Sequence, residues 1–313
     1  MNTVSKAVLL CSSMAMLFSA GCGIIHTGTQ PAAIAIDGAK NVWVVNKGSA
    51  DITKLNSSGG RMGTYPVGTN PYGIAIDRAG NVWVVNNGDG IVSELNPSGK
   101  IIKADTAGTE PKGIAIDSAG NIWVTNYFDS TITKLSSAGI TTATYTVGTM
   151  PWNIAIDGAG NLWVVNNDGA SVTKLSKSGV RMGTYPVGSN PIGIAIDRSG
   201  NVWVANNGAS TVSKLNPRGT LLGTFTAGTS PNGVAIDNAG NIWVTNQYSN
   251  RVTELNSAGK IIRTYAAGTE PCAIAIDSAG NVWVANYGED TVTKLAGAAK
   301  GPQYFPYTGP QWP

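Results

Sequence analysis

The 313-residue chain is poor in the residue types that usually carry cross-links or acid–base chemistry. It has one histidine, His26, and three cysteines, and charged residues make up only 12% of it. So few cysteines give no disulfide framework. Lys and Arg number 21 against 18 Asp and Glu, and the basic residues are spread along the chain. This charge pattern argues against nucleic acid as a partner.

Long apolar runs are also missing, apart from residues 7–18 near the N-terminus. That run follows Lys6 and precedes Ser19-Ala20-Gly21-Cys22, so residues 1–21 are interpreted as a signal peptide. The small residues before Cys22 resemble a bacterial lipobox, although Ser19 stands where leucine is usual. We therefore expect a lipid on Cys22 and a membrane-anchored lipoprotein. The alternative is ordinary cleavage after Ala20, which would give a periplasmic or extracellular protein.

A 40-residue repeat fills residues 28–307 without insertion or deletion. Each repeat begins with Gly-Thr/Ser-x-Pro, and in the first one the β-branched and aromatic segments are 34–36, 42–45, 52–55 and 64–67, separated by Gly, Asn, Ser and Asp. This pattern predicts four short strands per repeat. Because such a sheet is apolar on both faces, its neighbours must cover it, and radial closure is the usual solution. The sequence predicts an all-β, seven-bladed propeller of four-stranded antiparallel blades.

A propeller must also close. Residues 22–27 and residues 303–307 both fall in the register of the fourth strand, so either terminus could complete the last blade. Pro302 and Pro306 weaken the C-terminal candidate. We expect the N-terminal segment to close the ring and residues 308–313 to form a tail.

Three residue types recur once in every repeat. The Asp of Asp-x-x-Gly-Asn could suggest a ring of metal ligands, but its spacing is what a tight turn requires. The Trp six residues later alternates with aliphatic residues and is predicted to be core between blades. The Asn three residues after that Trp is predicted to cap loop backbone. In the first repeat these residues are Asp37, Trp43 and Asn46.

The motif Pro-x-Gly-Ile-Ala-Ile-Asp-x-Ala-Gly-Asn-x-Trp-Val, followed by Val-x-x-Leu, resembles the NHL repeat and, equally, the blades of streptogramin (virginiamycin B) lyases. The resemblance implies the propeller fold but no single activity, because such propellers include protein-binding, RNA-binding and catalytic members. Lyases of this type are expected to use a central histidine base and a carboxylate-bound Mg²⁺. No repeat of this chain contains a histidine.

The loops on one rim, called the top, differ strongly between repeats, whereas the turns on the bottom barely vary. The top loops are the Gly-Thr/Ser-x-Pro segment (the proline loop) and the link after the recurring Asn (the asparagine loop). We take their aromatic and charged residues as the candidate ligand-binding site. The candidates are Tyr72, Glu110, Lys112, Tyr127, Phe128, Asp129, Trp152, Tyr248, Arg251, Glu270 and Tyr287. Neutral divergence of exposed loops is the alternative.

Three functions remain open from the sequence. The favoured one is a non-catalytic, monomeric scaffold of the bacterial envelope that binds a protein, peptide or glycan at the top face and needs no cofactor. The second is a lyase-like or gluconolactonase-like enzyme that opens a lactone or cyclic ester with Mg²⁺ or Ca²⁺. The carboxylates that would then bind the ion or act as acid and base are Glu110, Glu270, Asp129 and Asp168. The third is a purely structural surface repeat protein. Cys272 has no histidine partner and is interpreted as a small filler.

Overall fold

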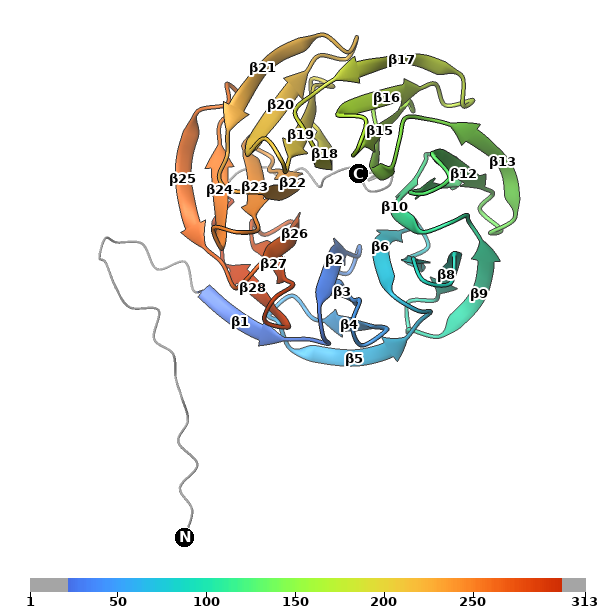
Figure 1. Ribbon diagram of the computed structural model, residues 1–313. Coiled ribbons are helices and arrows are strands. Elements are labelled where there is room, and N and C mark those ends of the chain that lie inside the picture. The colour runs from blue at the N-terminus through green and yellow to red at the C-terminus, as the bar shows by residue number, and fades with distance from the viewer. Residues whose placement is uncertain (1–21, 300–313) are drawn as a thin grey trace.

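The computed structural model describes residues 22–299, which form seven four-stranded antiparallel sheets arranged in a ring (Figure 1). The innermost strands are β2 (Pro31–Ile36), β6 (Pro71–Ile76), β10 (Pro111–Ile116), β14 (Pro151–Ile156), β18 (Pro191–Ile196), β22 (Pro231–Ile236) and β26 (Pro271–Ile276). The second strands are β3 (Val42–Asn46), β7 (Val82–Asn86), β11 (Ile122–Asn126), β15 (Leu162–Asn166), β19 (Val202–Asn206), β23 (Ile242–Asn246) and β27 (Val282–Asn286). The seven-bladed propeller is confirmed.

The outer half of each blade follows the same plan. The third strands are β4 (Asp51–Leu55), β8 (Ile91–Leu95), β12 (Thr131–Leu135), β16 (Ser171–Leu175), β20 (Thr211–Leu215), β24 (Arg251–Leu255) and β28 (Thr291–Leu295). The outer strands are β5 (Arg61–Pro66), β9 (Ile101–Thr106), β13 (Thr141–Thr146), β17 (Arg181–Pro186), β21 (Leu221–Thr226), β25 (Ile261–Ala266) and β1 (Cys22–His26). The inner and outer strands begin about three residues earlier than the apolar pattern indicates.

The N-terminal strand closes the ring. β1 pairs with β28 over its whole length, from Cys22 opposite Leu295 to His26 opposite Thr291, and so becomes the outer strand of the last blade. Ile25 packs into the cluster formed by Leu55, Val292 and Trp283 at the junction of the last and first blades. Residues 300–313, which contain the other candidate, lie outside the described part of the chain. Residues 22–299 include no helix long and apolar enough to cross a membrane.

The core lies between blades rather than within them. Each cluster joins one face of a blade to the opposite face of the next, as where Trp43 and Ile52 meet Val82 and Leu95. The seven recurring tryptophans are at most 1% exposed, so their prediction as core is confirmed. Burying apolar surface contributes about 25 cal/mol per Å², and this arrangement makes every blade depend on both neighbours.

The recurring aspartates stabilise the bottom turns and also hold the tryptophans. Asp37 accepts hydrogen bonds from the backbone N–H of Asn41 at 2.8 Å and from Trp43 Nε1 at 3.0 Å. The bond from Trp Nε1 recurs in all seven blades at 2.9–3.2 Å. Each carboxylate therefore fixes a turn and satisfies the one polar atom of a buried ring. The turn interpretation of these residues is confirmed.

The recurring asparagines fix the top loops. In every blade the Nδ2 donates to the Ser or Thr hydroxyl seven residues later at 2.8–2.9 Å. In four blades the Oδ1 also accepts the N–H of the glycine that opens the proline loop, as Asn86 does from Gly68 at 3.1 Å. The two loops of a blade are joined directly as well, because Lys47 N–H donates to Gln30 C=O at 3.0 Å. The capping prediction is confirmed in these four blades; in the other three, the buried Oδ1 atoms of Asn46, Asn126 and Asn246 have no hydrogen-bond partner among the described residues.

Candidate functional site

A cavity of about 440 Å³ occupies the centre of the propeller and opens at the top rim. Its wall consists of the innermost strands, whose isoleucines Ile34, Ile74, Ile114, Ile154, Ile194 and Ile274, with Val234, make the deep part apolar. The residue after the proline in each blade forms the mouth, and it is different in every blade. These seven residues are Ala32, Tyr72, Lys112, Trp152, Ile192, Asn232 and Cys272. The volume is in the range of small-molecule sites.

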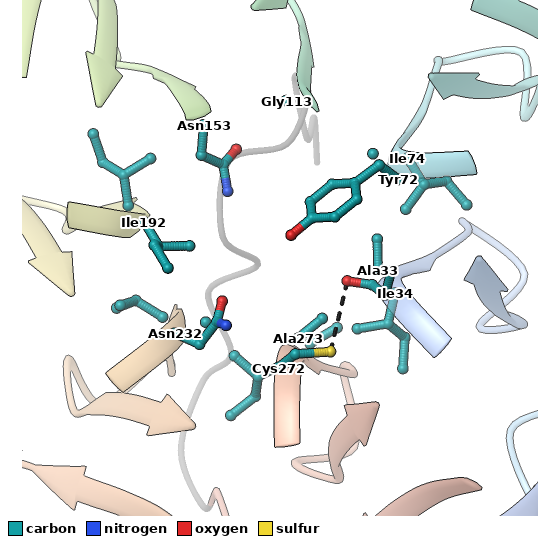
Figure 2. Close-up of a pocket in the computed structure, with 18 of the residues that line it drawn as sticks. Ala33, Ile34, Tyr72, Ile74, Gly113, Asn153, Ile192, Asn232, Cys272 and Ala273 are labelled. Carbon is teal, nitrogen blue, oxygen red and sulfur yellow. Dashed lines mark hydrogen bonds between the residues drawn. The ribbon is translucent and has the colours of Figure 1, made fainter. Parts of the chain in front are cut away.

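Small residues in the strands let the blades approach each other at this point. A Cβ on Gly73 would collide with the backbone carbonyl of Lys112, and one on Gly193 with that of Asn232. Most blades have Gly or Ala at this position, whereas the fourth has Asn153. Figure 2 shows Tyr72, Asn153 and Asn232 pointing toward the middle of the pocket from three different inner strands.

Lys112 is surrounded by aromatic rings at the mouth. Its Nζ lies 4.9 Å from the ring centre of Tyr72 and 5.1 Å from those of Tyr127 and Trp152. Trp152 packs edge-on against both tyrosines at 5.8 and 5.4 Å. We call these four residues the lysine cage. Attraction between an ammonium group and such rings contributes about 0.5–2 kcal/mol per contact.

The electrostatics of the cage follow from its burial. Removal of Lys112 from water lowers the pKa of its amine, and repulsion from Lys47 adds to this effect. The carboxylate of Glu110, 3.6 Å from Nζ, opposes it. Burial also raises the pKa of the Tyr72 hydroxyl, so this group remains protonated and acts as a hydrogen-bond donor.

Other predicted residues lie around this centre at different depths. Tyr287 lines the cavity with Lys47 stacked 5.9 Å above its ring. Phe128 packs on Tyr127 and is 57% exposed. Glu270 lines a second, shallower hollow with Asp290 and Tyr287.

The remaining three candidates stand outside the cavity wall. Asp129 accepts a hydrogen bond from the N–H of Thr109 at 2.7 Å and so fixes a proline loop. Tyr248 is 69% exposed on its asparagine loop, and Arg251 is an exposed residue at the start of β24. The structure therefore gathers Tyr72, Lys112 and Trp152 with their neighbours, whereas these three remain separate.

Asn153 and Gln247 line the cavity but were not among the sequence candidates. Asn153 could have been found, because it is the single Asn at a position otherwise held by Gly or Ala. Cys272, read as a filler, also faces the cavity, where its Sγ lies 3.1 Å from the Pro31 carbonyl. Burial raises the pKa of its thiol to about 12, so it is a poor nucleophile.

A divalent cation does not fit the residues of this pocket. Mg²⁺ and Ca²⁺ prefer carboxylate and carbonyl oxygens, but no Asp, Glu or His among residues 22–299 lines the cavity, and two lysines stand at its mouth. Among residues 22–299 no group of three or more His, Cys, Asp and Glu side chains is arranged to hold a metal. The single histidine, His26, is in the outer strand β1.

The fold defines a class, the seven-bladed β-propellers, and this one has a cavity at the centre of its ring. The model of the virginiamycin B lyase family matches residues 20–295, and the chain belongs to that family. The resemblance seen in the sequence is thus confirmed. No curated protein sequence matches the chain.

Solved structures agree on the fold. A streptogramin B lyase superposes with a TM-score of 0.80 at 20% identity, covering 87% of this chain and 96% of that one. Virginiamycin B lyase from Staphylococcus aureus gives 0.80 at 22% identity, with 88% and 98% covered. Hydrazine synthase of Kuenenia stuttgartiensis gives 0.75 at 16%, with 90% and 100% covered. At these identities the similarity establishes the propeller alone.

Proposed function

We propose that this protein is a non-catalytic binding scaffold of the cell envelope, which holds a protein, peptide or glycan at its top face. One observation carries the proposal. The recurring Asp, Trp and Asn residues are engaged in internal hydrogen bonds in every blade, whereas the seven residues at the cavity mouth are all different. A shared framework with one divergent, converging set of side chains is typical of a recognition site.

The aromatic side chains supply the binding energy in this proposal. Trp152, Tyr72 and Tyr127 form one packed group beside the cavity, and Phe128 extends it toward solvent. Large, half-buried aromatic residues next to a pocket dominate many interfaces. Stacking on these rings would suit either a sugar face or an aromatic side chain of a peptide.

The test is a triple variant, Tyr72→Ala with Phe128→Ala and Trp152→Ala, screened against a glycan array and a random-peptide display library. The matched control changes three exposed aliphatic residues of the outer strands, Met62→Ala with Ile102→Ala and Leu222→Ala. We expect ligands of the unmodified protein to be lost by the triple variant and kept by the control, with both thermal unfolding curves intact. Ligands that bind the triple variant as well as the original would overturn the proposal.

Family membership supports a second candidate, a lyase that opens a cyclic ester. The Staphylococcus aureus structure with quinupristin is of a catalytically inactive His-to-Ala variant, whereas no histidine among the described residues of this chain lines the pocket. Lys112 is the group whose lowered amine pKa suits removal of a proton next to a carbonyl. No step through a metal is derived, because the lining residues do not fit one.

The two candidates are separated by incubating the protein with a panel of cyclic esters and lactones, with and without Mg²⁺ or Ca²⁺. The scaffold proposal predicts no turnover under any condition. Ring opening that Lys112→Ala abolishes would establish the lyase instead. Ring opening that needs the cation and falls with Glu110→Gln or Glu270→Gln would point to the metal-dependent alternative.

We further propose that a lipid on Cys22 holds the protein at the membrane as a monomer. Cys22 begins β1, and its pairing with Leu295 places it at the bottom rim, on the side away from the cavity mouth. The top face would then point away from the bilayer. Metabolic labelling with radioactive palmitate and detergent phase partition test this: Cys22→Ser should lose both label and membrane fraction. Equal membrane association of this variant would exclude the anchor.

A further inference from the structure

Within the described part of the chain, every polar side chain that lines the central cavity carries a hydrogen-bond donor, and none is a carboxylate. The donors are Lys47, Tyr72, Lys112, Asn153, Asn232 and Gln247. Two of these donors, Lys47 and Lys112, are ammonium groups. They lie close enough together that repulsion from Lys47 contributes to the lowered pKa of Lys112. Below this ring the wall is aliphatic. The cavity therefore combines positive charge at its mouth with an apolar interior.

The carboxylates of the top face lie further out and several are held in place. Asp89, Asp129 and Asp290 each accept a backbone N–H of a proline loop, those of Thr69, Thr109 and Gln30. Glu289 accepts the hydroxyl hydrogens of Thr269 and Thr291. These bonds fix a negative rim around a positive centre. Such a field attracts a compact anion to the middle and repels a long polyanion that would cross the rim.

We propose that the cavity binds a small organic monoanion, a carboxylate with an aromatic or branched aliphatic body. Its carboxylate would lie between Lys112 and Lys47, and its apolar part would enter the isoleucine-lined interior. This inference rests on the proposed function of the cavity as a ligand site and adds the chemical class of the ligand. The ligand could be a free acid or the C-terminus of a peptide, since both present the same group.

Glu110 gives the proposal a sharp test, because it competes with the ligand. Its carboxylate already lies 3.6 Å from Lys112 Nζ, and its side chain is partly exposed at the rim. Removing its charge should therefore strengthen the binding of an anion. A site for a cationic ligand, in which the rings of the lysine cage and Glu110 receive the ligand after Lys112 moves out, predicts the reverse.

The experiment measures dissociation constants of phenylacetate, 4-methylpentanoate and the dipeptide acetyl-Ala-Phe by calorimetry, each paired with its neutral amide. We expect each acid to bind more tightly than its amide. Lys112→Met should weaken the acids by roughly tenfold, the usual effect of losing one charge-assisted bond, and leave the amides almost unchanged. Glu110→Gln should strengthen the acids by about threefold.

The matched control is Lys177→Met, at an exposed lysine of a bottom turn, which should change neither affinity. If amides bind as tightly as acids, the inference is wrong, while the scaffold proposal stands. If Glu110→Gln weakens the binding of tetramethylammonium and Lys112→Met strengthens it, the cavity is a site for a cationic ligand and the inference is overturned. If no carboxylate binds while array ligands do, the anion class is also rejected. Failure of the scaffold proposal would look different: ligands from the array or library would bind the aromatic triple variant as tightly as the original protein.

Discussion

Glu94 on β8 lies directly opposite Lys103 on β9, with the Lys103 Nζ 4.0 Å from the Glu94 Oε2. Five other blades have lysine at the Glu94 position and Gly or Ala at the Lys103 position, as where Lys54 lies opposite Gly63. Lys54 stacks on Trp43 and donates to the Pro97 carbonyl of the next blade at 2.8 Å. Lys103 donates to the Ala138 carbonyl of its next blade. A cation thus reaches across the blade interface in both cases.

This relationship predicts strong coupling between the two positions. Glu94→Lys alone places two ammonium groups together, and Lys103→Gly alone leaves a buried carboxylate without its cation. Each should lower the free energy of unfolding by about 1–2 kcal/mol. The double variant recreates the Lys–Gly pair of the other blades and should recover most of the loss. Chemical denaturation of all four proteins checks this, and additive single effects would contradict it.

Glu94 also predicts a pH dependence of stability. Glu94 as a whole residue is only 4% exposed, and burial raises the pKa of its carboxyl. The charge of Lys103 partly opposes this rise, and repulsion from Asp77 and Asp105 adds to it. The folded state therefore holds the proton more tightly than the unfolded state. Stability at this site is present at low pH and falls as pH rises through the window between the ordinary and raised pKa. Glu94→Gln should flatten that decline in a series of melting curves. An unchanged pH profile would show that Glu94 is ionised normally.

Lys40 gives a prediction about backbone strain. It occupies the turn position where the other six blades have glycine, and its φ is +66°. A side chain in this left-handed region costs about 1 kcal/mol relative to glycine. Lys40→Gly should raise the melting temperature, and the reverse change at an equivalent turn, Gly80→Lys, should lower it. If both variants have the same melting temperature as the original protein, the turn conformation carries no strain.

The fold was accessible from the sequence because the repeat removes ambiguity. The same pattern of strands and turns occurs in seven repeats, so an element that is ambiguous in one repeat can be assigned from the equivalent positions of the others. The strand boundaries were less accessible, because Pro31 and Asn46 belong to strands through their pairing with each other rather than through their own preference.

The site was accessible only in part. Comparing blades singles out Tyr72, Lys112 and Trp152, which the structure brings together. It does not tell that Asp129 turns outward to cap Thr109. It also does not tell that Gln247, from the sixth blade, reaches the cavity wall. The direction of these side chains depends on contacts with residues 15 to 20 positions away in the same blade, Thr109 for Asp129 and Asn232 for Gln247, which the local sequence does not specify.

Closure by β1 predicts opposite effects at two neighbouring residues. Ile25 packs against Leu55 and Val292 at the junction of the last and first blades, whereas Ile24 is 61% exposed. Ile25→Asp buries a charge at the junction of the last and first blades and should lower the free energy of unfolding by about 3 kcal/mol or more. Ile24→Asp should change it by less than about 0.5 kcal/mol. Limited proteolysis should cut the first variant near residue 27 and spare the second. Equal protection of both would mean that β1 does not hold the ring closed.

Lys112 should react with acylating reagents at lower pH than the exposed lysines of the chain. Only the neutral amine is nucleophilic, and burial lowers the pKa of this one, so its neutral fraction appears earlier as pH rises. Acetic anhydride labelling across pH 6–10, read by peptide mass spectrometry, gives a midpoint for each lysine, with Lys177 as the exposed reference. Glu110→Gln removes the carboxylate that favours the ammonium form and should move the Lys112 midpoint further down. A Lys112 midpoint at or above that of Lys177 would show that the cage rings and Glu110 outweigh desolvation, and that Lys112 is a fixed cation.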